Sequence, residues 1–388
     1  MTSYIHLLKR LEQVAPDIAA DANEGAGRHE GIRLLRGTGV PSALIPTAFG
    51  GGGLKFSEAS ALLERVAAID GSLGLILAMH FIHGTRFFNR ENMPDPMAAT
   101  ARRLAASNGL INFVSSEGPS GAPSRGGLPA SVARRLEDGG WRLSGRKSYV
   151  TGSSYLEAAL VSARIEPAEP EQGPRVGVFL LPLPHPGAWI DQNWEAFGMS
   201  ASASHDLVLE DVVLPADAYL ETIENGGLDK NSHLFGILWS TMLASVHCGL
   251  ATGARALALD YAKRPRLDGG EGTFAVLPRI QDAAARMELA LLTARAALDR
   301  ALLISEERAD AEASMLASAT RVIVHNEASR AVDYATQIVG GASVRLEHPI
   351  QRHYRDLRVA YFNPPNPDVI LNGLARKILG LDKEDGRP

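Results

Sequence analysis

The feature that most constrains the fold is a change of hydrophobic pattern that occurs twice along the chain. Through the first hundred residues, and again after residue 230, apolar side chains recur at the spacing of a helix that buries one face. Between these parts, short β-rich segments are separated by glycine, proline and acidic residues. This order predicts an α+β protein with a helical domain over 1–110, a β-domain over 111–222 and a helical bundle over 223–388.

Glycine marks two predicted turns. In the β-rich part, residues 134–147 are typical of a hairpin whose turn is Asp138-Gly139-Gly140. In the first helical part, the run from Gly50 to Gly53 has two interpretations, a phosphate-binding loop or a connector in which glycine supplies a positive φ. No Lys-Ser/Thr pair follows the run and no strand pattern precedes it, so the connector is favoured.

Charge and cysteine content exclude several classes of protein. The 39 basic and 44 acidic residues give a net charge of −5, whereas binding to nucleic acid requires a basic surface. Cys248 is the single cysteine, which excludes a disulfide framework and multi-cysteine metal sites. We find no signal-peptide pattern and no run of about 20 apolar residues that would span a bilayer. We therefore expect a cytoplasmic protein with no membrane or nucleic-acid partner.

Several short motifs follow one another along nearly the whole chain. They are GVPSALIPTAFGGGG at 39–53, Ser115-Ser116-Glu117, GRKSYVTG at 145–152, FGMS at 197–200, EDVVLP at 210–215, QIVGG at 337–341 and HPIQRHYRD at 348–356. In this order and spacing they resemble the acyl-CoA dehydrogenase superfamily of flavoproteins. The resemblance implies an N-terminal helical domain, a middle β-barrel or β-sandwich domain and a C-terminal four-helix bundle.

The resemblance also implies residues that hold a flavin ring. Thr151 matches the family threonine that reaches flavin N5, Ser116 matches a hydroxyl near the pyrimidine edge, and Tyr149 replaces an aromatic residue beside the ring. Phe113 and Ser115 lie on the same expected strand, 113–116. Hydrogen-bond donors at these places stabilise negative charge on the reduced ring. Without the surrounding motifs, Ser116 and Thr151 would be interpreted as ordinary strand residues.

A second set of residues matches the family's contacts to the rest of the cofactor. This set comprises Arg264, Gln337, Gly340, Gly341 and Asn366. The two glycines would present backbone N–H groups to a pyrophosphate, although two glycines after a helix are also a common C-cap. The arginine would meet the adenine half, although the segment RPRLDGGEGTF is longer than usual here. The resemblance implies FAD rather than FMN, and a homo-oligomer (dimer or tetramer), because the glycine element belongs to a neighbouring subunit.

The positions of the family's catalytic base carry no acid in this sequence. A dehydrogenase needs a carboxylate over its substrate because the α-proton of a thioester is only weakly acidic. In most relatives this glutamate lies nine residues after the arginine of the Arg-Asp motif, and counting from Arg355 reaches Pro364. In a minority it lies ten residues before a glycine that aligns with Gly249, and that position is Trp239.

Asp368 is the acid that follows the first of these positions most closely. It has two interpretations. It is either a relocated catalytic base or the N-cap of the next helix, where its carboxylate would accept hydrogen bonds from backbone N–H groups.

One branch of the fold lacks the base and consists of oxygenases, in which reduced flavin and O₂ form a C4a-hydroperoxide. This branch often has a histidine on an N-terminal helix and a second one after the Arg-Asp motif. His80 and His83 are candidates for the first, because histidine moves protons near neutral pH; a core role for His80 and a surface role for His83 are the alternatives. The second position aligns with Asn363, which can donate a hydrogen bond but cannot relay a proton. No third ligand accompanies the histidines, so a metal site is not expected.

Trp239 and Tyr361, with His83, are candidates for lining a substrate pocket, although core packing explains these rings equally well. We therefore hypothesise a flavin-dependent monooxygenase that uses O₂ and acts on a small organic or acyl-thioester substrate. Reduced flavin would come from a separate flavin reductase, because no G-x-G-x-x-G motif for NAD(P)H is evident. The alternatives are an FAD-dependent acyl-CoA dehydrogenase with a relocated base and a non-catalytic subunit that retains the fold.

Overall fold

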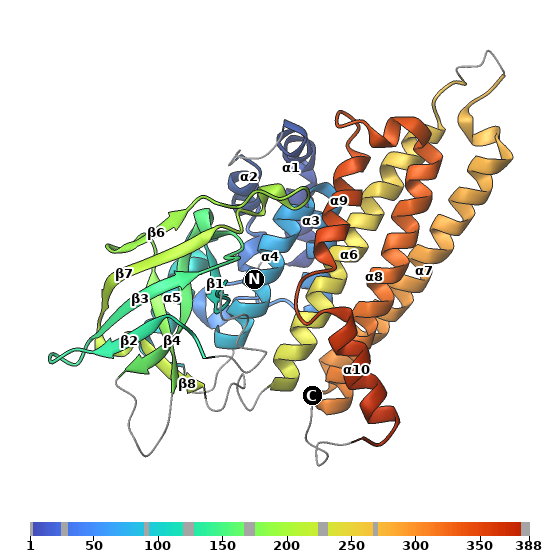
Figure 1. Ribbon diagram of the computed structural model, residues 1–388. Coiled ribbons are helices and arrows are strands. Elements are labelled where there is room, and N and C mark those ends of the chain that lie inside the picture. The colour runs from blue at the N-terminus through green and yellow to red at the C-terminus, as the bar shows by residue number, and fades with distance from the viewer. Residues whose placement is uncertain are drawn as a thin grey trace.

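The computed structural model in Figure 1 describes residues 3–24, 30–88, 93–118, 128–166, 175–223, 232–266 and 271–381. A β-sheet lies on one side of the molecule, the N-terminal helices lie in the middle, and the long helices of the C-terminal half lie on the other side. The predicted order of helices, strands and helices is confirmed.

The N-terminal part is helical. Its α-helices are α1 (Tyr4–Glu24), α2 (Glu30–Thr38), α3 (Phe56–Ile69), α4 (Gly71–Phe88) and α5 (Asp95–Ser107). Helix α4 packs against α3, α6 and β1, and all its residues except Arg86 are buried. Both histidines of α4 therefore lie inside the protein.

Within the described residues, the β-domain is one hydrogen-bonded sheet of eight strands. They are β1 (Leu110–Val114), β2 (Val132–Arg135), β3 (Trp141–Lys147), β4 (Leu156–Glu166), β5 (Val176–Pro182), β6 (Ala188–Asp191), β7 (Asp206–Leu214) and β8 (Tyr219–Ile223). Their order is β6-β7-β3-β2-β4-β5-β8, with β1 beside β4. The sheet is mixed, because β1 and β2 run parallel to β4 and the other pairs are antiparallel. Strand β1 ends at Val114, so Ser115 and Ser116 lie just beyond the strand that was expected to contain them.

Both glycine turns are confirmed. Strands β2 and β3 form the predicted antiparallel hairpin, and the Gly140 N–H donates to Asp138 Oδ1 at 2.8 Å. Gly50 and Gly53 have φ values of 89° and 59°, as a connector requires. This loop packs on itself so closely that a Cβ at Gly51 would lie 2.1 Å from the carbonyl oxygen of Ile45.

The C-terminal part is again helical. Its α-helices are α6 (Ser232–Ala262), α7 (Pro278–Glu307), α8 (Ala311–Val339), α9 (Ile350–Ala360) and α10 (Pro367–Ile378). By length and composition the segment His233–Ala262 of α6 is apolar enough to cross a membrane, but 78% of its most apolar window is buried inside the protein. In Figure 1, α6 lies between the N-terminal helices and the pair α7 and α8, which explains its apolar character.

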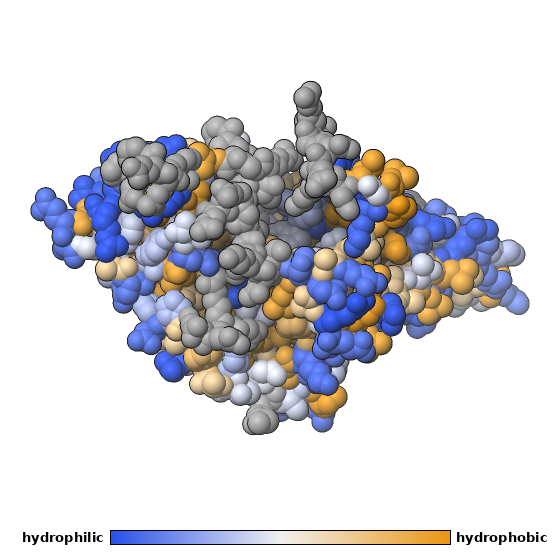
Figure 2. Space-filling model, turned by 90° about the horizontal axis from the view of Figure 1, so that it is seen from below, coloured by the Kyte–Doolittle hydropathy of each residue, from blue (hydrophilic) through white to orange (hydrophobic). Residues whose placement is uncertain are grey.

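The surface carries apolar side chains as well as polar ones. Seen from below, hydrophobic residues interrupt the hydrophilic surface in several places (Figure 2). On α7, Leu289, Leu292 and Leu303 are exposed. Apolar side chains grouped on one exposed helix are a common feature of surfaces that contact another chain.

Candidate active site

The aromatic cluster defined by His83, Phe113, Phe235 and Trp239 brings three elements together. The His83 ring centroid, on α4, lies 5.7 Å from that of Phe113 on β1. On α6, the ring centroids of Phe235 and Trp239 lie 5.8 and 5.5 Å from His83. Sequence reasoning identified every member of this cluster except Phe235.

His83 is a buried imidazole with a free nitrogen. Its side chain is 3% exposed, and Nδ1 has no hydrogen-bond partner within the described ranges. Burial lowers the pKa of His83 to about 3, and the nearby charge of Arg86 adds to this effect. The ring is therefore neutral near pH 7 and can accept or share a proton with a bound molecule. The alternative interpretation, in which His83 is a surface residue, is wrong.

The two positions of the family base lie together in space, and neither carries an acid. The indole Nε1 of Trp239 donates a hydrogen bond to the carbonyl oxygen of Pro364. Counting along the motifs thus located two positions, 125 residues apart, that share one site. A proline and a tryptophan cannot remove a proton from carbon, so the site lacks the base at both places.

The loop from Tyr361 to Asn366 is fixed by Arg321 of α8. Its guanidinium donates to the carbonyl oxygens of Asn363, Pro364 and Pro365. The side chain of Asn363 remains available, because its Nδ2 is buried and has no partner among the described residues. An orphaned buried donor of this kind is a candidate contact for a substrate or cofactor oxygen.

The residues expected beside a flavin ring lie where β3 and β1 end. The Thr151 hydroxyl is 3.0 Å from that of Ser204, and the carbonyl oxygen of Thr151 accepts from Asn112 Nδ2 at 2.9 Å. The Ser116 carbonyl oxygen accepts from the Ser148 N–H at 2.8 Å. Asn112 precedes Phe113 on β1, so this edge is joined to the aromatic cluster.

Tyr149 supports a planar ligand at this edge. Its side chain is 68% exposed beside the buried Val150, and its φ of 58° is rare for a residue with a bulky side chain. Backbone hydrogen bonds of Ser148 and Val150 hold it in this conformation. Strain maintained by the surrounding structure is typical of ligand sites, and an exposed ring beside the Thr151 hydroxyl fits a flavin.

The longer segment after α6 brings Phe274 back beside Arg264 and Tyr261. The Phe274 N–H donates to the Arg264 carbonyl oxygen at 3.0 Å, and Tyr261 stacks on Phe274 with 5.5 Å between centroids. The guanidinium of Arg264 lies 5.0 Å from the Tyr261 centroid. Residues 267–270 of the segment lie outside the described residues. A cation beside stacked rings offers a platform for a planar base.

The other expected cofactor residues lie at two helix ends. Gly340 is the C-cap of α8, with a φ of 67°, and its N–H donates to the Thr336 carbonyl oxygen. Gln337 and Gly341 are exposed nearby. Asn366 is the N-cap of α10. Figure 1 shows the C-terminal end of α8 well separated from β3, so Gln337, Gly340 and Gly341 do not join the ring-side residues within one chain.

His80 is a structural residue rather than the catalytic one that we expected. Its Nε2 lies 2.8 Å from the carbonyl oxygen of Pro41, and its Nδ1 accepts from the Ile111 N–H at 3.1 Å. Burial lowers the pKa of His80 to about 4. Both nitrogens are committed to the backbone, so neither is left to move a proton.

The structure does not place Asp368 or Tyr361 among the rings of the aromatic cluster. Helix α10 begins at Pro367, so Asp368 is its second residue rather than its N-cap, and its side chain is exposed. Tyr361 packs against His325, with 5.2 Å between ring centroids, instead of joining Trp239.

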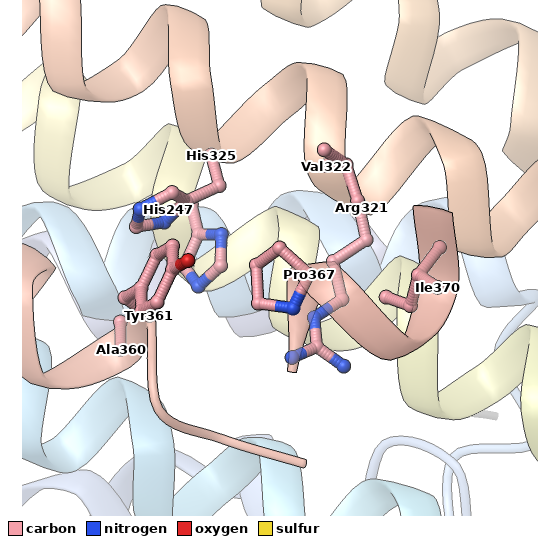
Figure 3. A pocket seen from close by; sticks show the side chains of 8 residues that line it. All are labelled: His247, Arg321, Val322, His325, Ala360, Tyr361, Pro367 and Ile370. Atoms are coloured by element: carbon pink, nitrogen blue, oxygen red, sulfur yellow. The ribbon is translucent and has the colours of Figure 1, made fainter. Parts of the chain in front are cut away.

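The sequence analysis missed a second buried cluster, which lies behind the loop (Figure 3). His247 of α6 and His325 of α8 face each other with ring centroids 4.9 Å apart. Tyr361 and Arg321 line the same small cavity. No motif contains either histidine, and only the packing of α6 on α8 joins them.

Comparison with known proteins establishes the family. Residues 113–212 match the middle domain of acyl-CoA dehydrogenases, and residues 241–379 match their C-terminal domain. YdbM of Bacillus subtilis (strain 168), which is assigned to the acyl-CoA dehydrogenases, is 31% identical over 359 residues, or 92% of this chain and 91% of YdbM. The chain therefore belongs to the acyl-CoA dehydrogenase family.

This chain is also similar to a monooxygenase and to a structure that contains FMN. The dibenzothiophene monooxygenase of Mycolicibacterium goodii is 26% identical over 356 residues, which cover 85% of this chain and 82% of that protein. The structure of KijD3 in complex with FMN and a dTDP-amino sugar has a TM-score of 0.84 at 23% identity, covering 98% and 94% of the two chains. The family supports a flavin cofactor and places the protein among the flavin-dependent oxidoreductases.

Proposed function

We propose that this protein is a flavin-dependent monooxygenase that inserts oxygen from O₂ into a small organic substrate. The observation that carries the proposal is the hydrogen bond between Trp239 and Pro364. It joins both positions at which family dehydrogenases hold their base and leaves no carboxylate at either. Without that base, removal of an α-proton has no acceptor. The similarity to a dibenzothiophene monooxygenase gives further support.

Glu221 and Asp368 do not substitute for the base in this arrangement. Glu221 forms an ion pair at 3.2 Å with Arg86, whose guanidinium carbon lies 5.5 Å from the centroids of Phe113 and Phe235. Asp368 is exposed at the start of α10. Neither is a free carboxylate among the cluster's rings.

His83 and Asn363 are the residues that we expect to contact the reacting molecule. His83 offers a neutral imidazole nitrogen and Asn363 offers an amide donor, and both atoms are buried without a partner in the described part of the chain. Trp239 connects them, because it packs on His83 and bonds to the residue after Asn363. The surrounding aromatic rings exclude water, which strengthens both hydrogen bonds.

The residues at the end of β3 and at the end of α6 are proposed to hold FAD. Bound reduced flavin supplies the electrons that activate O₂. Thr151 and Tyr149 would contact the ring, and Arg264 would contact the adenine half. Because the glycine end of α8 is separated from β3 in one chain, a second copy would supply Gly340 and Gly341. A homodimer or homotetramer, and a separate reductase as the source of reduced flavin, follow from this proposal.

Oxygen labelling tests the proposal. The purified protein is mixed with reduced FAD, ¹⁸O₂ and panels of aromatic compounds, amines and acyl thioesters, and products are analysed by mass spectrometry. We expect one ¹⁸O atom in the product, and a rate that falls about tenfold for Asn363→Ala through loss of one hydrogen bond. Turnover that leaves no label in any product would contradict the proposal.

An acyl-CoA dehydrogenase is the second candidate, because YdbM favours it. Here an acid or His83 would remove the α-proton while the flavin accepts hydride. Anaerobic addition of acyl-CoA would then bleach the flavin absorbance, and Asp368→Asn would abolish the bleaching if that residue were the base. We expect no bleaching. Bleaching together with an absence of ¹⁸O in the product would replace the first candidate with the second.

A further inference from the structure

The cavity behind the 361–366 loop is lined by cationic and hydrogen-bonding groups without an acid. Its lining residues are His247, Arg321, Val322, His325, Ala360, Tyr361, Pro367 and Ile370. In Figure 3 the two imidazoles and the Tyr361 ring gather on one side, and the Arg321 side chain extends past Pro367. The cavity volume is about 10 Å³, which leaves room for one water-sized species. This space suits a small ion and excludes a flavin or a long acyl chain.

Arg321 is a buried cation without a counter-charge. Its side chain is 2% exposed, and its hydrogen-bond partners are the three neutral carbonyl groups of the loop. Burial alone lowers the pKa of Arg321 to about 10, and no carboxylate among the described residues pairs with it. A buried charge of this kind is costly unless an ion of opposite sign compensates it.

His247 and His325 add two more groups that an anion would satisfy. They are 1% and 6% exposed, and Nδ1 of each lacks a hydrogen-bond partner within the described ranges. An imidazole pair with 4.9 Å between centroids has room for one shared ligand at its edge. Buried polar atoms normally have partners, so unpartnered nitrogens beside a cavity point to a bound species.

We propose that this cavity binds a small monovalent anion such as chloride, held by His247 and His325 beside Arg321 and taken up together with one proton. The proton makes one imidazole a cationic donor, and the anion then lies beside two positive charges, the imidazolium and Arg321, and neutralises one of them. The site is separate from the aromatic cluster and does not depend on which reaction the protein catalyses. Because Arg321 also fixes Pro364, anion binding would stabilise the loop that borders the proposed active site.

The charged groups around the histidines determine the direction of the pH dependence. Burial lowers the pKa of His325 most, and Arg321 on α8 and Arg358 on α9 lower it further; Arg358 is itself paired with Asp333. On α6, burial and the charges of His325 and Arg321 lower the pKa of His247, and the Ala360 backbone of α9 acts in the opposite direction. Tyr361 contributes a phenol hydroxyl, and Asp368 of α10 is exposed. With no acid facing the pair, protonation requires the anion, so anion affinity must strengthen as the pH falls.

The test uses the purified full-length protein. Thermal unfolding is measured against sodium chloride and against sodium gluconate, which is too large for the cavity, at constant ionic strength. We expect a saturable rise in Tm with chloride alone, and an apparent affinity that weakens about tenfold for each pH unit between pH 6 and 8. Crystals grown with bromide should show an anomalous peak between the two imidazoles.

Matched variants assign the effect to the site. His247→Gln and His325→Gln should each abolish the chloride-specific rise, whereas His233→Gln, on an exposed position of the same helix α6, should retain it. Equal responses to chloride and gluconate would overturn the proposal, as would retention of the rise in both cavity variants. The bromide crystals decide independently if a variant does not fold, because an ordered water in place of the anomalous peak would refute the anion site.

Discussion

His80 and His83 lie one turn apart on α4, yet their surroundings give them opposite roles. The backbone of Pro41 and Ile111 occupies both nitrogens of His80. His83 packs among aromatic rings, and its Nδ1 has no hydrogen-bond partner among the described residues. At the scale of single residues, the number of free hydrogen-bonding atoms separates a structural histidine from a functional one.

Replacing each histidine by leucine should separate stability from activity. In His80→Leu the Pro41 carbonyl and the Ile111 N–H lose their partner inside the protein, so we expect the free energy of unfolding to fall by about 2–4 kcal/mol. In His83→Leu no hydrogen bond to a described residue is lost. We therefore expect the free energy of unfolding to fall by about 1 kcal/mol or less, whereas turnover should fall tenfold or more. Urea unfolding and single-turnover rates measure the two effects. Equal destabilisation by both changes would refute the assignment.

The sequence predicted those residues of the site that belong to motifs. Counting from Arg355 and Gly249 located Pro364 and Trp239, which the structure brings into contact. His247 and His325 escaped prediction because they belong to no motif and meet only through the packing of α6 on α8. Contacts of this kind depend on helix rotation and crossing, which periodicity alone does not determine.

At the scale of elements, one buried ion pair connects β3 to the segments around it. Lys147, at the end of β3 and 0% exposed, lies 2.5 Å from Glu117. The Glu117 carboxylate also accepts from the backbone N–H groups of Ala130 and Ser131. The pair therefore fixes the segment that leads into β2. Lys147 itself lies two residues before the exposed Tyr149.

Removing one member of this pair should be much more harmful than removing both. Lys147→Met leaves a buried carboxylate without its cation, and we expect a loss of about 3–5 kcal/mol in the free energy of unfolding. The double change Lys147→Met with Glu117→Leu should recover a large part of it, since no buried charge remains. Chemical denaturation of the wild type and the three variants forms a double-mutant cycle. A double variant that is less stable than Lys147→Met would contradict this account.

Element boundaries were harder to predict than element types. The hairpin at 134–147 was predicted correctly because Asp-Gly-Gly specifies a turn directly. Strand β1 ends before Ser115, and α10 begins at Pro367 with Asn366 at its N-cap, so Asp368 is displaced from the expected cap. A proline at the first helical position already has helical φ, which moves the helix start earlier than the acid suggested.

At the scale of the whole molecule, α6 connects the parts on which both sites depend. It packs against α3, α4, α7, α8 and α9. Trp239, near its start, borders the aromatic cluster, and His247, two turns later, borders the second cavity. The same burial that assembles these sites keeps their histidines uncharged.

This burial should make the protein sensitive to acid. Burial lowers the pKa of the five buried histidines in the described part of the chain: to about 4 for His80 and His325, to about 3 for His83 and His353, and in the same direction for His247. Below pH 6.5 these histidines bind protons in the unfolded chain, whereas in the folded chain they stay unprotonated until the pH is much lower. The stability that the uncharged histidines allow is therefore complete above pH 6.5, and the free energy of unfolding decreases as the pH falls towards 4.

Three buried acids act in the opposite direction. Burial raises the pKa of Asp356 to about 7 and also raises the pKa values of Glu64 and Asp70. A raised acid stabilises the fold at low pH and loses this contribution as the pH rises through its folded pKa. Five histidines against three acids leave a net loss of stability on acidification.

The urea midpoint should therefore fall between pH 7 and pH 5, and each fully buried histidine should contribute up to about 2 kcal/mol over this interval. His83→Leu removes one titrating group, so its midpoint should depend less steeply on pH than that of the wild type. His6→Leu, at an exposed position of α1, is the control and should follow the wild type. A midpoint that stays constant or rises on acidification would show that the buried acids, rather than the histidines, determine how this fold responds to pH.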